Sequence, residues 1–583
     1  MKRLILSRLW MLISIIILTT GQAWAQTTPQ KVFNSIKDLR DGAQTNGNQH
    51  DDVVVKFEDS NPATVVAVMK NSEKDYDDEK FVNSFFIVDK SNYGLWVSPK
   101  GVYDKNLFTT WNLKIGSKIT GSIIGDYRQN DSGMPYFGSL LKSVKIGETS
   151  YQTDLTINRD GEASGTKEAV YPCTKVDDVN TIAKNNDAAS YGPYLNTIIQ
   201  VPGTIKKGTN NEYYLVQDEN TGTGTDYRDK RIYFSCSQLP NINIDDYVGT
   251  SGTFEGILIK RKDSESKLIV LKDNFFKVKK IYLDENDAEG RVEYLASQGA
   301  FDGEVDVYVH RTNLVNSAGA WNTICLPFDL NKEEFKNAFG CELTALAKPT
   351  ASDESAHQWT GTVNDKGVLS FTKLADTELT IKAGVPYLMQ ASGEQTCCTK
   401  TVRGSENMTP EELKTEDANY YASVGEKTIT VNAPYEVKAL YNDEIVNGEF
   451  YFRGLYGRKK YVDGSTTTLI ADGGSQKYQY ISTAAGSYLK YLPSGSTLQF
   501  NGMRAYFYFP NWNAENNNAA QDASNGTNAK IHVAVMAAST TGISNISAAE
   551  ASKQAEVYNL SGQRVDASYK GFVVRNGRKY LRK

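Results

Sequence analysis

Cysteine and histidine are scarce in this chain, which has six cysteines and four histidines among 583 residues. The cysteines do not repeat at the spacings of zinc modules or small disulfide scaffolds. No nucleophile elbow, zinc-protease helix, phosphate-binding glycine loop or dinucleotide fingerprint is present either. The motifs therefore predict no metal ion, no cofactor and no catalytic residue. The histidines are scattered, at positions 50, 310, 357 and 532.

The cysteines that are present are expected to be structural. Cys397 and Cys398 are adjacent, as in some metal and redox sites, but no histidine lies near them in the sequence and no second pair accompanies them. We expect buried or disulfide-bonded thiols there. Cys173 and Cys236 both fall in the second of two repeated segments, and we predict a disulfide between them, as an oxidising compartment would permit.

A large excess of charge of one sign is also lacking, because 64 basic residues are balanced by 69 acidic ones, for a net charge of −5. Both signs are interspersed along the chain, so it lacks the basic surface that gathers nucleic acids. We therefore do not expect nucleic acid as a partner.

Long apolar runs are absent except at the N-terminus. A basic pair precedes that run, and Ala23-Trp24-Ala25 follows it, before Gln26. This order predicts a secretory signal peptide over residues 1–25, cleaved between Ala25 and Gln26. The run is too short for a membrane anchor, and no later stretch could span a bilayer. The mature chain is expected to pass through the periplasm to the extracellular space or the outer cell surface.

Aromatic residues are plentiful, with 34 tyrosines and 22 phenylalanines, a composition that suits strands. One aromatic and aliphatic run, Phe85-Phe86-Ile87-Val88-Asp89, is echoed by Tyr213-Tyr214-Leu215-Val216-Gln217-Asp218. Thirty positions after each Asp comes another apolar stretch, at Ile119 and at Val248. This spacing predicts one module used twice.

Each module contains five short strand candidates with turn signals between them, which predicts a small antiparallel barrel. We place the modules at 30–147 and 166–285, with a polar linker at 149–165. The order of elements, and the stretch Ile115-Gly116-Ser117-Lys118-Ile119-Thr120-Gly121, resemble the OB-fold, especially the secreted OB-like modules of Bacteroidetes. The resemblance implies that the sheet face of the second and third strands binds oligonucleotides or oligosaccharides.

Four aromatic residues fall on those strands and are the candidate ligand-binding residues: Phe86, Trp96, Tyr214 and Tyr233. A base or a sugar ring could stack on them. Period-two alternation offers a second interpretation, in which most of these rings lie in the barrel core. We favour that second interpretation.

Residues 300–538 form a third region of strands and turns with few short helices, for which we predict a β-sandwich. Asn331 and Glu334 form a capping box at the start of one helix, and Gly340 ends it. The stretches Trp321–Phe328, Ala383–Leu388 and Arg504–Phe507 resemble a region that recurs in secreted Bacteroidetes proteins. That recurrence implies a structural or attachment module.

The C-terminal residues 541–583 predict a small β tail with an Asn-Gly hairpin turn at Asn576-Gly577. The stretch from Val557 through Lys579 resembles the type A C-terminal sorting domain of the Por (type IX) secretion system. The resemblance implies that the secretion machinery is a partner. The upstream strands of that family have no match here, which leaves open whether the tail directs export.

Three functions remain compatible with the sequence of this all-β chain. We favour a non-catalytic secreted or surface protein that binds glycan or protein through its OB-like modules. An extracellular single-stranded nucleic-acid-binding protein is one alternative. A glycoside hydrolase or other hydrolase with its site in 300–538 is another, because its two carboxylates need no linear motif.

Overall fold

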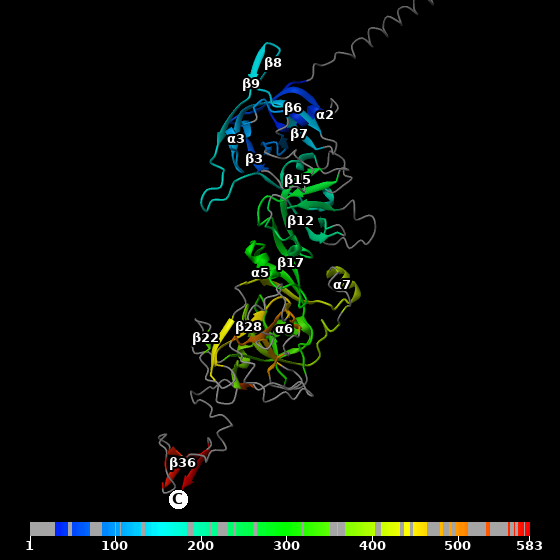
Figure 1. Ribbon diagram of the computed structural model, residues 1–583. Coiled ribbons are helices and arrows are strands. Elements are labelled where there is room, and N and C mark those ends of the chain that lie inside the picture. The colour runs from blue at the N-terminus through cyan, green and yellow to red at the C-terminus, as the bar shows by residue number, and fades with distance from the viewer. Residues whose placement is uncertain are drawn as a thin grey trace, which may run out of the picture.

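The structure is a computed structural model of the chain (Figure 1). It describes residues 30–44, 49–69, 84–98, 101–104, 106–129, 134–182, 192–208, 211–217, 231–236, 239, 241–260, 265–316, 320–349, 358–359, 368–400, 402, 408, 410–431, 436–442, 447–462, 478–481, 489–491, 497–510, 532–536, 558–559, 565, 569–575 and 578–582. The signal peptide predicted over 1–25, its cleavage at Ala25–Gln26, and Asp218 lie outside the described residues. Within the described part, no helix is long and apolar enough to cross a membrane.

The first module is a closed five-stranded barrel. Its strands pair in the order β3-β4-β5-β7-β6, and β6 pairs back with β3 to close the ring. Apolar side chains on the inner faces of these strands form one core with Trp111 of the short helix α3 (Leu107–Trp111). The strands are β3 (Ala63–Val68), β4 (Phe85–Val88), β5 (Gly94–Val97), β6 (Lys118–Gln129) and β7 (Pro135–Gly138).

The second module repeats this topology. Its strands pair in the order β12-β13-β14-β16-β15, and β15 pairs back with β12. In both barrels the third strand along the chain pairs parallel to the fifth strand along the chain, as β5 does with β7 and β14 with β16. The two predicted five-stranded barrels are thus confirmed. The strands are β12 (Ile198–Lys207), β13 (Tyr213–Val216), β14 (Ile232–Ser235), β15 (Ser251–Lys260) and β16 (Ser266–Ile269).

Strand register shows which residues of the two barrels correspond. Thr64 pairs with Val88 and Lys118, while Thr204 pairs with Val216 and Ser251. Lys118 therefore corresponds to Ser251, and the next residue, Ile119, to Gly252. The repeat is real, but the equal spacing from Asp to Ile119 and Val248 is a coincidence of loop lengths, because Val248 precedes β15.

The residue after the second strand fastens each barrel to the segment before it. Asp89 accepts a hydrogen bond from the N–H of Ile36, 2.7 Å, at the start of the helix α2 (Ile36–Gln44). At the corresponding position, Gln217 accepts one from the N–H of Val179, 3.3 Å, at the start of a 3₁₀ turn. The conspicuous Asp at the end of the first run therefore caps a helix.

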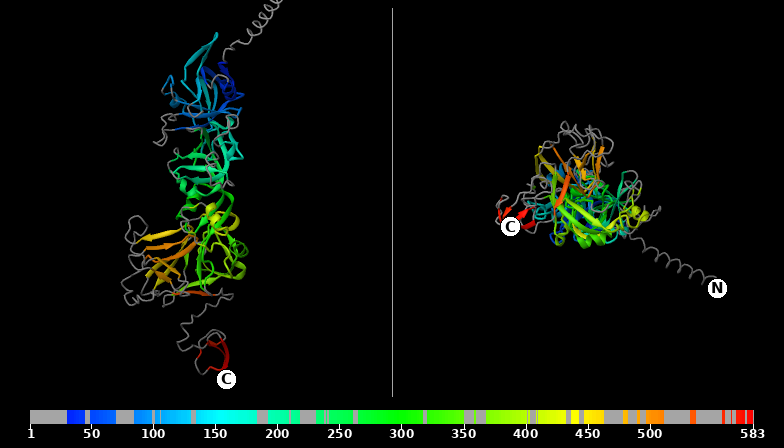
Figure 2. Two further views of the ribbon diagram at one scale, coloured as in Figure 1. Left: turned by 90° about the vertical axis from the view of Figure 1, so that its right-hand side faces the viewer. Right: turned by 90° about the horizontal axis from the view of Figure 1, so that it is seen from below.

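The third region begins as a continuation of the second barrel's sheet. Strand β17 (Phe276–Asp284) pairs with β15, and β18 (Phe301–His310) pairs parallel to β17 across the helix α5 (Arg291–Ser297). Strand β26 (Ala422–Thr428) then pairs with β18. The barrel and the third region therefore share one nine-stranded sheet, and they follow one another along the molecule (Figures 1 and 2).

Two larger sheets of this region pack face to face, which confirms the predicted sandwich. The apolar core between them includes Phe371 and Leu388 from one sheet and Phe452 and Phe507 from the other. The five-stranded sheet contains β19 (Asn322–Ile324), β25 (Tyr387–Ser392), β21 (Glu342–Pro349), β23 (Val368–Lys373) and β34 (His532–Met536). The six-stranded sheet contains β22 (Gln358–Trp359), β27 (Glu436–Asn442), β28 (Asn447–Leu455), β33 (Arg504–Tyr508), β30 (Tyr478–Ile481) and β31 (Leu489–Tyr491).

Helix α6 (Lys332–Phe339) covers part of the third region's core. The Asn331 side chain accepts from the N–H of Glu334, and Glu334 accepts from the N–H of Asn331, so the predicted capping box is confirmed. Gly340 ends the helix with a φ of 80°. Phe335 and Phe339 pack with ring centroids 5.0 Å apart, which directs this helix face into the core.

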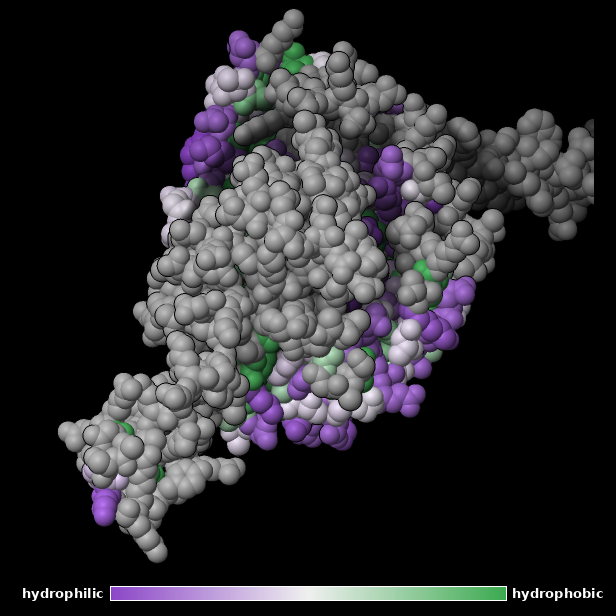
Figure 3. Space-filling view, turned by 60° about the horizontal axis from the view of Figure 1, so that its bottom comes forward, coloured by the Kyte–Doolittle hydropathy of each residue, from purple (hydrophilic) through white to green (hydrophobic). Residues whose placement is uncertain are grey.

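The C-terminal tail contains a small antiparallel sheet. Its strands are β35 (Tyr558–Asn559), β36 (Gly571–Arg575) and β37 (Arg578–Arg582). The turn predicted at Asn576-Gly577 lies outside the described residues, but the strands on either side of it pair. Seen from the C-terminal end, the described surface is mostly hydrophilic, with hydrophobic residues in small separate spots (Figure 3).

Candidate binding site between the two barrels

The two barrels are docked against each other through an apolar contact. Phe86, Val88 and Trp96 on the outer face of the first barrel pack in one cluster with isoleucines of the second, namely Ile198, Ile257, Ile259 and Ile269. Phe86 and Trp96 are directly paired across β4 and β5, and they are 0% and 3% exposed. The predicted stacking platform of the first module is therefore covered by the second module, and neither ring can meet a ligand.

A polar contact fixes the angle between the barrels. Asn196, in the second barrel, is fully buried and donates from its side-chain amide to the carbonyl of Pro135 in the first, 2.8 Å. The backbone carbonyl oxygen of Asn196 lies only 2.3 Å from the position that a Cβ on Gly94 would take. Only glycine allows so close an approach of two backbones.

The segment between the barrels is fastened to the first of them. Within the linker predicted at 149–165, β10 (Asp154–Asn158) adds to the edge of β6. Glu162 is 8% exposed and accepts from Ser117 Oγ at 2.5 Å and from Arg159 Nη1 at 2.9 Å. The linker is thus part of the first barrel's packing, and it leads the chain along the junction.

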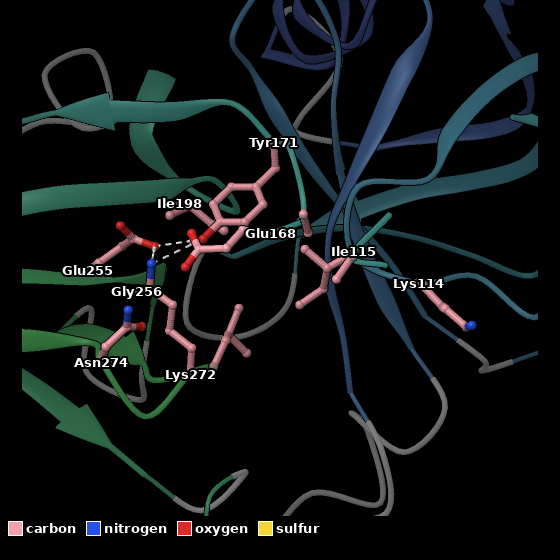
Figure 4. Close-up of a pocket in the computed structure, with 12 residues that line it drawn as sticks. Lys114, Ile115, Glu168, Tyr171, Ile198, Glu255, Gly256, Lys272 and Asn274 are labelled. Atoms are coloured by element: carbon pink, nitrogen blue, oxygen red, sulfur yellow. Dashed lines mark hydrogen bonds and ion pairs between the residues drawn. The ribbon is translucent and has the colours of Figure 1, made fainter. Parts of the chain in front are cut away.

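A pocket of about 440 Å³ opens at this junction (Figure 4). Tyr171 projects into it from the linker side, while Glu255 and Lys272 come from the second barrel. The first barrel contributes Lys114 and Ile115. Five of the remaining lining residues are small or apolar, namely Ala163, Ala169, Ile198, Gly256 and Leu271. The other two, Glu168 and Asn274, are polar. A concave, mainly apolar site with a few convergent polar groups is the usual form of a ligand pocket.

The polar groups of the pocket form one hydrogen-bonded network around Glu255. Lys272 Nζ lies 2.6 Å from Glu255 Oε1, and the Tyr171 hydroxyl donates to the same oxygen at 2.8 Å. Gln200 Nε2 donates to the other carboxylate oxygen at 2.8 Å. Tyr171 thus has its hydroxyl end held in place, which orients its ring on the pocket wall.

This network fixes the protonation states in the pocket. Burial alone would raise the pKa of Glu255, but hydrogen bonds from Lys272 and Gln200 outweigh it and lower the pKa. Burial would lower the pKa of Lys272, and the hydrogen bond with Glu255 raises it instead. Burial, followed by the charge of Glu255, raises the pKa of Tyr171 to about 12. Near neutral pH the site therefore holds a carboxylate, an ammonium and a neutral phenol.

The lowered pKa of Glu255 predicts a pH-dependent contribution to stability. A glutamate with a depressed folded-state pKa stabilises the fold above its unfolded pKa of about 4.3, and this is lost as pH falls through the folded value. We expect Glu255→Gln to lower the free energy of unfolding by about 1–2 kcal/mol at pH 7. Urea titrations should show this gap closing between about pH 5 and pH 3. An equal difference in the free energy of unfolding between the native chain and Glu255→Gln at both pH values would contradict the ionised state of Glu255.

The corresponding rings of the second module are also covered. Tyr214 and Tyr233 pair directly across β13 and β14, as Phe86 and Trp96 do in the first barrel, and they are 9% and 5% exposed. The Arg231 guanidinium lies over both rings, 5.5 Å and 4.5 Å from their centroids. None of the four aromatic residues predicted to bind ligand therefore presents an open ring face. They lie on the outer faces of their barrels, against other protein groups.

The predicted Cys173–Cys236 disulfide is not formed in the structure, where both are free thiols. Cys173 lies on β11 (Cys173–Lys175) near the charges of Glu255 and Lys272. Cys236 instead packs against the second barrel's core, near Tyr247. The two thiols belong to different surroundings, which explains why no bridge joins them.

A second cavity, of about 630 Å³, lies in the third region and is polar. Its ionisable lining residues are Glu304, Asp329, Glu334, Lys382, Glu426 and Lys427. Lys382 binds Asp329 at 2.7 Å, and Lys427 binds Glu334 at 2.6 Å. Burial opposes the change, but these lysines lower the pKa of both carboxyls. Among the described residues, no group of three or more His, Cys, Asp or Glu side chains is placed to hold a metal ion.

Sequence reasoning missed Tyr171, Glu255 and Lys272 as site residues. Tyr171 lies just after the predicted linker, and the other two are on different segments of the second barrel, so no linear motif joins them. One signal was available: Phe85 to Val88 is an unbroken apolar run, and such runs indicate a strand covered on both faces. A comparison of the chain with protein-family models and with curated proteins finds no match.

Proposed function

We propose that this protein is a non-catalytic secreted or cell-surface binding protein that holds a glycan in the pocket between its two barrels. The observation that carries the proposal is the oriented Tyr171 ring beside the ionised Glu255–Lys272 pair in a concave, mainly apolar site. The first barrel's outer ring face is used to dock the second barrel, so binding belongs to the junction.

The chemistry of the pocket suits a sugar ring. A sugar presents an apolar C–H face, which an aromatic ring can cover, and hydroxyl groups that both donate and accept hydrogen bonds. Around Tyr171 the pocket offers carboxylate acceptors from Glu168 and Glu255, a donor from Lys272, and the Asn274 amide, which does both. A small number of such groups in an apolar pocket fixes the orientation of a ligand.

The same network argues against catalysis at this site. A glycosidase needs one carboxylic acid with a raised pKa to protonate the leaving group. Glu255 is held as a carboxylate by Lys272 and Gln200, and its pKa is lowered. Tyr171, with its pKa raised to about 12, is a poor general base at neutral pH. Binding without turnover is what these groups can do.

Two resemblances support placing the protein outside the cell. The N-terminal residues 1–25 have the pattern of a signal peptide, and the C-terminal tail resembles a sorting domain of the Por (type IX) secretion system. The OB-like strand order also belongs to a family that includes oligosaccharide binders. We propose a Bacteroidetes-type exported protein, with the secretion machinery as its partner in transit.

The proposal is tested by screening the full mature chain, residues 26–583, on a glycan array together with Tyr171→Ala. We expect glycan binding by the native chain and at least tenfold weaker binding by Tyr171→Ala, because the ring wall is lost. Tyr151→Ala is the matched control, since Tyr151 is a half-buried tyrosine outside the pocket. Absence of binding by the native chain would overturn the glycan assignment and favour a protein ligand.

A hydrolase is the second candidate, favoured by the four carboxyl groups that line the cavity in the third region. Asp329 and Glu334 are held ionised by lysines, so Glu304 and Glu426 would have to supply the acid and the base. Release of reducing ends from a bound glycan, abolished by Glu304→Gln with Glu426→Gln, would establish this activity. Intact glycan after prolonged incubation would exclude it.

A further inference from the structure

Two adjacent thiols lie in a buried cluster beside the C-terminal end of helix α6, where Cys397 Sγ donates to the carbonyl of Ala338. Cys397 and Cys398 follow β25, and their Sγ atoms are 3.4 Å apart. Cys397 is 7% exposed and Cys398 is fully buried. The Cys398 residue has a φ of 56°, in the left-handed region that few non-glycine residues adopt. Such backbone strain is often found at functional sites.

The fold brings a histidine to this pair that the sequence does not show. His310, at the end of β18, is 2% exposed, and its ring stacks on Tyr420 at 3.8 Å. Its Nδ1 lies 2.6 Å from the carbonyl oxygen of Tyr420, and its imidazole also forms a hydrogen bond with the Cys398 side chain. The Tyr420 hydroxyl in turn donates to Asp284 at 3.0 Å. Thiol, imidazole and carboxylate are therefore gathered at one place.

The arrangement divides the two thiols into a nucleophile and a resolving partner. The contact with Cys397, followed by the hydrogen bond with His310, lowers the pKa of Cys398. The contact with Cys398, followed by burial, raises the pKa of Cys397. Burial lowers the pKa of His310, but the hydrogen bond with Cys398 and the charge of Asp284 raise it overall. A thiolate beside an imidazolium is the reactive form of a cysteine.

We propose that Cys397 and Cys398 form a reversible redox site that a small peroxide converts to a vicinal disulfide. The Cys398 thiolate attacks one peroxide oxygen, and the oxygen–oxygen bond breaks to give a sulfenic acid and hydroxide. The Cys397 thiol then displaces hydroxide from the Cys398 sulfur. The sum is two thiols and hydrogen peroxide giving one disulfide and two waters. A small oxidant suits a pair with so little exposure.

Geometry makes the oxidised form easy to reduce. Adjacent residues have Cα atoms about 3.8 Å apart across a trans peptide, below the range of about 4.4–6.8 Å usual for disulfides. A strained disulfide is more oxidising, so added thiols reduce it readily. The site is therefore expected to cycle, whereas a structural disulfide would persist. This inference is independent of the pocket between the barrels.

The test treats the reduced full chain with hydrogen peroxide, unfolds it in guanidinium chloride with N-ethylmaleimide so that buried thiols are also alkylated, and maps the label by mass spectrometry. Of six cysteines, we expect Cys397 and Cys398 to lose the label together, and dithiothreitol to restore it. Cys398→Ser should leave Cys397 labelled. Cys341→Ser is the control, because Cys341 is buried near the same pair. Loss of the disulfide in Cys341→Ser, or a Cys341–Cys397 bridge in the native chain, would overturn the proposal.

A pH profile of the native chain tests the site without any variant. An ordinary thiol, with a pKa of about 8.5, loses most of its thiolate between pH 8 and pH 6, so its oxidation slows roughly fiftyfold or more. For the vicinal pair we expect a rate at pH 6 within about threefold of that at pH 8. A fiftyfold fall would contradict the Cys398–His310 pairing. The ionisable groups around Cys398 are Cys341, Cys397, His310, Arg311 and Asp284.

Discussion

Replacing Glu285 with alanine is expected to destabilise the third region by about 3–5 kcal/mol. Glu285 is 2% exposed and receives hydrogen bonds from Arg504 Nη2 at 2.9 Å and Arg311 Nη1 at 3.4 Å. Arg311 is fully buried, so Glu285→Ala would leave an uncompensated charge in the interior. Arg504 belongs to β33, and Glu285 and Arg311 follow β17 and β18, so the network also joins separate sheets.

The control for this change is Glu289→Ala. Glu289 pairs with Lys459 but is 39% exposed, and such surface pairs contribute about 1 kcal/mol or less. Urea unfolding of both variants measures the difference. Glu285→Gln keeps a hydrogen-bond acceptor and should fall between the two. Equal stability of Glu285→Ala and Glu289→Ala would show that the buried guanidinium groups do not depend on Glu285.

Replacing Gly94 with alanine is expected to force the two barrels apart. The new Cβ would lie 2.3 Å from the Asn196 carbonyl oxygen and 2.8 Å from that of Leu195, and backbone atoms cannot move aside cheaply. We expect a loss of about 2–3 kcal/mol, with weaker glycan binding because the pocket lies at the displaced junction. Small-angle X-ray scattering should show a longer particle.

Gly208→Ala is the matched control for the docking variant. A Cβ at Gly208 would meet a ring atom of Tyr214 at 3.4 Å, an ordinary contact, and Gly208 is outside the pocket. We expect its stability, scattering profile and glycan binding to match the native chain. If Gly94→Ala behaves like Gly208→Ala in all three measurements, the barrels are not held by the contact of Asn196 with Gly94.

Local patterns were sufficient to predict the elements and the barrels. The capping box of Asn331 and Glu334 depends only on neighbouring residues, and each barrel depends on short apolar runs separated by turns. The function of the ring faces could not be read in the same way. Outward-facing Phe86 and Trp96 follow the same period whether a ligand or a second barrel covers them, and only the three-dimensional packing distinguishes the two.

Sites built from distant segments could not be predicted from the sequence for a related reason. Tyr171 meets Glu255 because the linker runs along the barrel junction, and His310 meets Cys398 because β18 ends beside the segment after β25. No histidine lies near the cysteine pair in the sequence, yet His310 lies beside it in the fold. Distance along the chain therefore did not predict the surroundings of these thiols.

Hydrogen–deuterium exchange of the full chain, with and without its best-binding glycan, tests the pocket between the barrels most directly. We predict slower exchange in residues 168–174, 253–258 and 270–275, which carry Tyr171, Glu255 and Lys272. The Tyr214–Tyr233 face and the cavity of Glu304 and Glu426 should be unchanged. Slowing confined to either of those places, with none at the junction, would contradict the proposal that the glycan binds between the barrels.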